Sequence, residues 1–235
     1  MFAAAVLHAS PARADDDDAV GTRRMFVSHY EVSALTGVGG PLALENAAAP
    51  RISGVQLVEN NGPILQTLAG EKHGYTDDCR DVCSRLEVSA YGPVRSFGED
   101  DGRPRARGFD VMAGAAFKLM KVRAGDGPRQ PVMFTMGTGY ATLRTPDGAP
   151  YRNLGVVFRL TMPITTWLEG FAQWNVNVLR AVHPFVPSME GTFTSPLRVG
   201  ATVSIGNRLF VRGIRSVNAI ATYGLGWQLE AGVRL

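Results

Sequence analysis

The chain has 235 residues, 45% of them hydrophobic, and a formal net charge of +3. This length suffices for one large domain or two small ones. No uncharged run approaches the roughly 20 residues of a membrane-spanning helix, and Lys and Arg form no block of the kind that binds nucleic acid. The 27 glycines and 14 prolines divide the chain into short segments, which favours strands joined by turns over helices.

Residues 1–14 are predicted to be a secretory signal peptide. They contain a short apolar core, Phe2 to Leu7, and end in Ala12-Arg13-Ala14, which is typical of a cleavage site. No Lys or Arg precedes the core, so we interpret the leader as truncated at its start. Residues 15–24, which begin with four aspartates, are then expected to be a disordered acidic N-terminus.

Residues 25–84 are predicted to contribute two strands to a barrel that spans residues 25–235. Met25–Leu35 and Arg51–Glu59 would form these strands, and Gly70–Ser84 would be a long periplasmic connection. The alternative is an eight-stranded barrel preceded by a small periplasmic or plug segment. Ten strands are favoured because alternate residues of the first segment supply an apolar face: Phe26, Tyr30, Val32 and Ala34.

Both cysteines of the chain, Cys79 and Cys83, lie in this long connection. An oxidising compartment favours a local disulfide between them, with free thiols as the alternative. A metal site would need more ligands than two thiols and the nearby His73, so no metal site is predicted.

Residues 85–235 are predicted to form eight strands. The last of them shows the pattern most clearly, because apolar and polar residues alternate strictly in GWQLEAGVRL, which ends at Leu235. A two-residue period places the apolar side chains on one face of a strand and the polar side chains on the other. The eight strands are expected at Arg85–Phe97, Gly108–Arg123, Pro131–Arg144, Leu154–Thr165, Trp167–Ala181, Leu197–Ile205, Arg208–Val217 and 225–235.

The connections between these strands differ in length. AGDGPR, TT and GN are short, whereas GEDDGRPRA, PDGAPY, VHPFVPSMEGTFTS and the NAIATYG region are longer. Short turns at one end and longer loops at the other are expected of an outer-membrane barrel. An antiparallel sandwich gives no reason for this segregation.

On strand alternation, loop asymmetry and the terminal strand GWQLEAGVRL, residues 85–235 resemble the small outer-membrane β-barrel proteins of diderm (Gram-negative) bacteria. The resemblance implies an all-β fold, a closed antiparallel transmembrane β-barrel of about 8 to 10 strands with short periplasmic turns and longer extracellular loops. It also implies an outer-membrane location, with the barrel-assembly machinery, membrane lipid and lipopolysaccharide as partners. The chain departs from this class at Leu235, where Phe or Trp is usual.

The alternation also predicts which charged side chains face the lumen. These candidates are Lys118, Arg159, Glu169, Arg198, Glu230 and Arg234. Their mixed signs predict a network of ion pairs. In so narrow a barrel such a network favours a structural plug over a conducting path.

Aromatic residues near the predicted strand ends are expected to form girdles at two membrane interfaces. They are Tyr91, Phe97, Tyr140, Tyr151, Trp167, Trp174 and Trp227. Packing in the core of a sandwich is the alternative interpretation.

The predicted function is a structural, surface-interaction or narrow-pore (porin-like) role, with no catalysis, no cofactor and no nucleic acid. A solute or extracellular ligand is not specified by the sequence. One alternative is a lipid-modifying hydrolase that uses His183 and Ser188 in the loop after the strand at Trp167–Ala181, although no nucleophile-elbow motif is present. Another is a soluble periplasmic β-sandwich or a lipocalin-like carrier of an apolar ligand.

Overall fold

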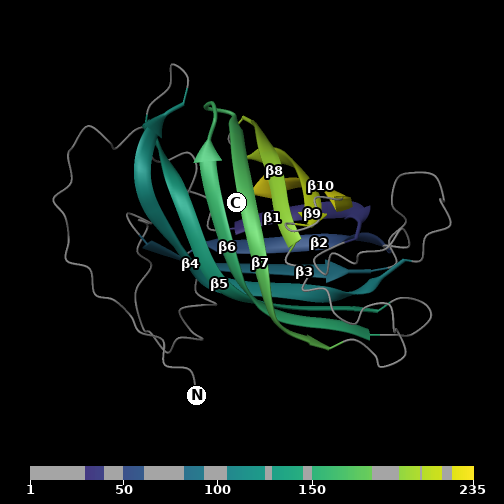
Figure 1. The fold of residues 1–235 in the computed structure, drawn as a ribbon. Coiled ribbons are helices and arrows are strands. Elements are labelled where there is room, and N and C mark those ends of the chain that lie inside the picture. Colours follow the sequence, from purple (N-terminus) through teal and green to yellow (C-terminus); the bar gives the residue numbers. More distant parts are fainter. Residues whose placement is uncertain are drawn as a thin grey trace, which may run out of the picture.

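The computed structural model of the chain describes residues 30–39, 50–60, 82–92, 105–124, 129–144, 150–181, 196–206, 208–218 and 224–235. These residues form a single antiparallel sheet in which each strand pairs with its neighbour along the chain (Figure 1). The strands are β1 (Tyr30–Val38), β2 (Arg51–Asn60), β3 (Val82–Tyr91), β4 (Arg107–Arg123), β5 (Arg129–Arg144), β6 (Pro150–Pro163), β7 (Leu168–Ala181), β8 (Pro196–Ile205), β9 (Leu209–Asn218) and β10 (Gly224–Arg234). The first strand also pairs with the last, so the sheet is a closed ten-stranded barrel. The predicted all-β barrel is confirmed, and a two-sheet sandwich is excluded.

The barrel closes where β1 meets β10. Glu31 to Val38 on β1 face Arg234 to Trp227 on β10 in unbroken register. The amide of Leu235 donates to the carbonyl oxygen of Tyr30 at 2.9 Å, so the pairing continues to the last residue. Because these two strands satisfy each other's backbone groups, the described sheet has no free edge.

Three strands differ from the prediction by three residues or more. The strand expected at Leu154–Thr165 already begins at Pro150 and ends at Pro163. The first strand of the barrel was expected at Met25–Leu35, whereas β1 runs three residues further, to Val38, and residues 25–29 lie outside the described part. The strand expected at Arg85–Phe97 begins earlier, at Val82, because Val82 and Cys83 already pair with β4. Cys83 therefore lies within β3 rather than in the preceding connection.

The two ends of the barrel differ in their connections. At one end, here called the turn end, lie connections 61–81, 124–128, 164–167 and 206–208, together with the start of β1 and the end of β10. At the other end, the loop end, lie connections 39–50, 92–106, 145–149, 182–195 and 219–223. The expected asymmetry in length is therefore partial. At the turn end, connection 61–81 is long, and it includes the long connection predicted before the strand at Arg85. At the loop end, connection 145–149 has the same length as connection 124–128 at the turn end.

Two of the short turns have a clear local cause. Between β6 and β7, the amides of Ile164 and Thr165 both donate to the carbonyl of Leu168, at 2.9 and 3.0 Å. Pro163 lacks an N–H group and stands as the last residue of β6, where the ladder ends. Between β8 and β9, Gly206 has a φ of 64°, in the left-handed region that glycine adopts without strain.

The outer face of the barrel is apolar and its inner face is polar. On β10, Trp227, Leu229 and Val233 point outward with exposed fractions of 44%, 46% and 37%, whereas Gln228 and Glu230 are buried inside. The same alternation holds around the sheet. Exposed large apolar residues occur on every strand from β1 to β10, among them Val32, Val55, Val82, Phe109, Met136, Leu160, Trp174, Val203, Val211 and Leu229. The described part of the chain therefore has the sidedness opposite to that of a soluble globular domain.

One member of the predicted aromatic girdle does not lie on the outer face. Tyr140, Trp174 and Trp227 are exposed on the outer face, and Trp167 is exposed in the turn between β6 and β7. Tyr91 instead points inward, is 6% exposed and donates a hydrogen bond to Asp110 at 2.7 Å. The reason is its position, two residues from the inward-facing Ser89, which places it on the polar face of β3. The side chain of Tyr151 and all of Phe97 lie outside the described residues.

Three other predictions fall outside the described part of the chain. They concern the signal peptide at 1–14, the acidic segment 15–24, and Cys79, the partner of Cys83 in the predicted disulfide. All three therefore remain predictions. The described residues contain no helix that is long and apolar enough to cross a membrane.

Candidate functional site in the barrel interior

The six charged residues predicted for the lumen all lie on the inward side of their strands. Arg198 and Glu230 are buried, with exposed fractions of 8% and 1%, and the other four are half-buried. Arg159, Glu169 and Arg234 line one shared cavity inside the barrel. Lys118 lies opposite Met133 on the next strand, just before an irregularity in the pairing of β4 with β5.

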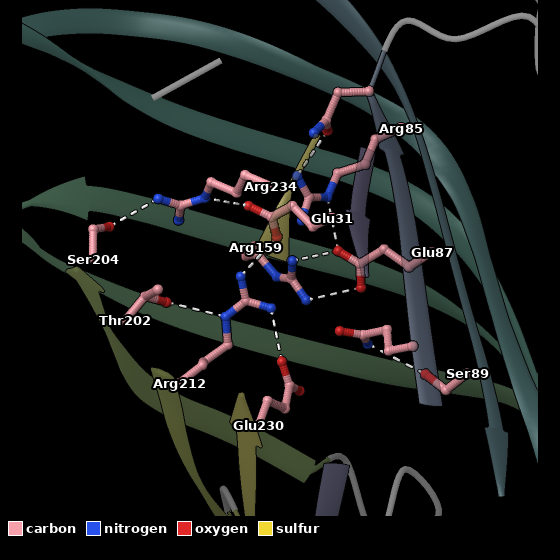
Figure 2. A network of polar contacts seen from close by, with 12 residues as sticks. Glu31, Arg85, Glu87, Ser89, Arg159, Thr202, Ser204, Arg212, Glu230 and Arg234 are labelled. Carbon is pink, nitrogen blue, oxygen red and sulfur yellow. Dashed lines mark hydrogen bonds and ion pairs between the residues drawn. The ribbon is translucent and has the colours of Figure 1, made fainter. Parts of the chain in front are cut away.

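Arg212 is the centre of the largest cluster of ion pairs (Figure 2). Its guanidinium donates to Oε2 of Glu230 at 2.9 Å and to Oε2 of Glu31 at 3.0 Å. Its Nε donates to Oγ1 of Thr202 at 3.0 Å. Arg234 donates to the other oxygen of Glu31 at 2.9 Å. One carboxylate thus holds two guanidinium groups, and the cluster joins β8, β9 and β10 to β1.

Glu87 is the centre of a second cluster. It accepts from Nε of Arg85 at 2.7 Å and from both terminal nitrogens of Arg159, one of them at 3.1 Å. Arg159 also donates to Oε1 of Gln173, and Arg85 donates to Oδ1 of Asn60 at 2.9 Å. The paired, partly bidentate geometry is the strong form of a charge-assisted hydrogen bond.

A third contact connects Arg198 with the first cluster. Nη2 of Arg198 donates to Oε1 of Gln228 at 3.1 Å, and Nε2 of Gln228 donates to Oε1 of Glu230 at 2.6 Å. The described inner face carries five arginines near five carboxylates: Arg85, Arg159, Arg198, Arg212 and Arg234 near Glu31, Glu87, Asp110, Glu169 and Glu230. Charges so balanced and so closely paired stabilise one arrangement, because removing one partner leaves the other buried alone.

The ion pair between Arg159 and Glu87 crosses two intervening strands. Arg159 lies on β6 and Glu87 on β3, with β4 and β5 between them. Between the register level of Arg159 and that of Glu87, β4 and β5 carry the register partners Gly114 and Gly137, neither of which has a side chain.

The loop end of the interior is closed by apolar side chains. Leu35, Ile52, Tyr91, Ala106, Ala141 and Leu143 form a buried cluster there. Ala106 is held in place because its amide donates to the carbonyl of Arg51 at 2.8 Å, beside a parallel bridge between Arg51 and Arg105. The segment preceding β4 thus bends across the end of β3 to reach β2 and helps to seal the barrel.

A cavity lies towards the turn end of the described interior. The cavity has room for the centres of water molecules in a volume of about 40 Å³, enough for a few waters. Its polar lining includes Arg159, Arg212, Arg234, Glu31 and Glu169. Glu169 makes no hydrogen bond or ion pair with another described residue and meets the surrounding arginines only through space.

Replacement of Glu169 by glutamine is expected to be tolerated. Because the carboxylate of Glu169 makes no hydrogen bond or ion pair with a described residue, Glu169→Gln should lower the free energy of unfolding by less than about 1 kcal/mol. The measurement is urea unfolding of the refolded protein in detergent micelles. A loss above about 2 kcal/mol would instead mean that the Arg212 cluster needs this carboxylate as a counter-charge.

The predicted set of lumen residues lacked Glu31, Arg85, Glu87, Asp110 and Arg212. The two-residue period had nevertheless placed Arg85, Glu87 and Asp110 opposite the apolar rows of their strands. Arg212 was hard to recognise because Phe210 and Ile214 occupy the same inward face of β9, so this strand carries no polar row. The turn at Gly206 could have identified Arg212 as a lumen residue. Counting the strand register outward from this turn places Arg212 opposite Thr202, which lies on the polar face of β8.

The residues considered for catalysis, His183 and Ser188, lie outside the described part of the chain, so the hydrolase alternative gains no support from the structure. Within the described strands, no three His, Cys, Asp or Glu side chains are grouped so as to hold a metal ion. The chemistry that the described interior offers is mutual neutralisation of charge and the holding of a few waters.

Comparison with known proteins adds no family to this description: no protein-family model, no curated protein and no solved structure matches the chain.

Proposed function

We propose that this protein is a bacterial outer-membrane β-barrel with a structural or surface-interaction role and a closed lumen. The observation that carries the proposal is its sidedness. Large apolar side chains are exposed on the outside of all ten strands, and paired charges line the inside together with two small apolar clusters. A sheet in hydrocarbon must pair all of its backbone groups and expose apolar side chains to lipid, and this barrel meets both conditions.

The same sidedness argues against a soluble carrier. A lipocalin-like protein would need an apolar interior to bind an apolar ligand and a polar exterior to remain in water. Here the interior contains arginine–carboxylate clusters, and Trp174 and Trp227 are 46% and 44% exposed outside. Burying apolar surface of this extent against lipid removes the aggregation hazard that it would cause in water.

Heat-modifiable mobility tests the membrane proposal. The purified protein, loaded in sodium dodecyl sulfate without boiling, is expected to run as a compact band that shifts after boiling, because closed membrane barrels resist detergent until heated. Cell fractionation should recover the protein with the outer membrane. Recovery in the aqueous periplasmic fraction, with no shift on heating, would contradict the proposal.

The interior favours a closed barrel over a pore for solutes. Both ends of the described lumen carry side-chain clusters, and about 40 Å³ of water-accessible space does not form a wide channel. Liposomes that contain the refolded protein should therefore not swell in an isosmotic solution of a small sugar, whereas liposomes with a wide porin should. Swelling at a rate comparable to that porin would show that the lumen opens.

A further inference from the structure

Two arginines face each other on the outer surface at the loop end. Arg107 of β4 and Arg144 of β5 are register partners in an antiparallel pair, and both side chains are exposed. Opposite residues of such a pair have Cβ atoms only about 5 Å apart, and like charges in this position repel. Replacing one of the two arginines with a carboxylate or an uncharged strand-forming residue would remove this repulsion.

A third arginine completes the group. Arg152 of β6 is exposed and faces Thr142, two residues before Arg144. It is therefore a diagonal neighbour of Arg144 on the same outer face. None of the three arginines forms an ion pair with a described residue, and the described outer faces of β3 to β6 carry no carboxylate. The repulsion thus has no counter-charge among the described parts of these strands.

Apolar side chains begin directly next to the three arginines. Phe109, Tyr140 and Leu154 are 42%, 37% and 41% exposed on the same face. The rings of Phe109 and Tyr140 lie 5.9 Å apart. The surface thus changes within one or two residues from guanidinium groups at the rim to an aromatic and aliphatic band below.

We propose that Arg107, Arg144 and Arg152 bind the phosphate groups of an anionic lipid in the leaflet at the loop end, with its acyl chains lying on Phe109, Tyr140 and Leu154. The inference rests on the proposed membrane location and adds a specific lipid contact to it. A phosphate between the guanidinium groups removes their repulsion through charge-assisted, bidentate hydrogen bonds. An acidic peptide would supply the charge, but it would leave the apolar band below without acyl chains to cover it.

The test measures lipid retained by the full chain in neutral detergent micelles, using native mass spectrometry and a titration with diphosphorylated lipid A. Wild type is expected to bind at least about 10-fold more tightly than the variant Arg107→Gln/Arg144→Gln/Arg152→Gln. The matched control is Arg215→Gln, which removes an exposed arginine from the outer face of β9 and should bind like wild type. Equal affinity of wild type and triple variant would overturn the inference.

Two further arms identify the source of the phosphate. Lipid A stripped of its phosphates should bind wild type and triple variant alike, and weakly. Inorganic phosphate at millimolar concentration should not displace the lipid, because it cannot occupy the apolar band. Displacement would mean that the group binds free phosphate instead and would contradict the assignment to lipid.

Folding and lipid binding are separated by two controls. Each variant is first checked for heat-modifiable mobility. If the barrel inserts but lipid binding does not depend on the arginines, the lipid site is contradicted and the proposed function is unaffected. If the wild-type chain fails to insert, the proposed function is contradicted as well. Arg144→Glu provides an independent readout: it replaces the like-charge pair with an opposite pair and should raise the unfolding midpoint in neutral micelles while lowering lipid affinity. A lower midpoint with unchanged affinity would contradict the inference.

Discussion

Replacement of Arg212 by methionine should destabilise the barrel by about 3 to 5 kcal/mol, the usual cost of removing one partner from a buried ion pair. Arg212 bonds Glu230 at 2.9 Å and Glu31 at 3.0 Å, and Glu230 is 1% exposed. Methionine fills much of the same volume but leaves Glu230 with a single amide donor, from Gln228. The effect is measured as the change in the free energy of unfolding in urea, followed by tryptophan fluorescence of the refolded protein.

The same strand supplies the matched control. Arg215 lies three residues further along β9, on the outer face, and is exposed. Arg215→Met should change the free energy of unfolding by less than about 0.5 kcal/mol. The double variant Arg212→Met/Glu230→Gln should recover part of the loss, because the uncompensated carboxylate is gone. Equal effects of Arg212→Met and Arg215→Met would show that the interior cluster does not hold the barrel closed.

Much of the fold could be predicted because the outside of the barrel imposes one strict rule. On β8 and β10 nearly every second residue is apolar, so strand position and sidedness followed from a period of two. The lumen positions of Arg198, Glu230 and Arg234 follow from that period alone. Arg212 on β9 was not predicted, because the packed interior also accepts the apolar side chains of Phe210 and Ile214 on the same face.

The pairing of the charges could not be predicted. Glu31 and Arg234 are 203 residues apart in sequence, and Arg159 reaches Glu87 across two strands. Alternation predicts only which side chains of a strand point inward. Which guanidinium meets which carboxylate depends on the stagger between strands and on where glycines leave space, and both are properties of the closed barrel. The inward position of Tyr91 shows the same limit, because residue type suggested an interface whereas register decided the side.

The glycine pair Gly114 and Gly137 leads to the second large effect. A Cβ atom built on Gly114 would lie 2.3 Å from the carbonyl oxygen of Met136 and 2.5 Å from the Cα of Gly137. Both obstacles are backbone atoms of β5, so the strands themselves would have to separate. We expect Gly114→Ala to cost about 3 kcal/mol, at the upper end of the range for overpacking. Because β4 and β5 lie between β3, which carries Glu87, and β6, which carries Arg159, the strand shift should also weaken that ion pair.

Gly213 provides the control for this prediction, since a Cβ atom there would meet nothing within 4 Å. Gly213→Ala should be neutral or stabilising by up to about 1 kcal/mol, because alanine restricts the unfolded chain. Unfolding of both variants in urea gives the comparison, and the temperature at which the compact gel band is lost gives a second measure. If Gly114→Ala proved as stable as Gly213→Ala, β4 and β5 would not approach each other as closely at Gly114 as the structure shows.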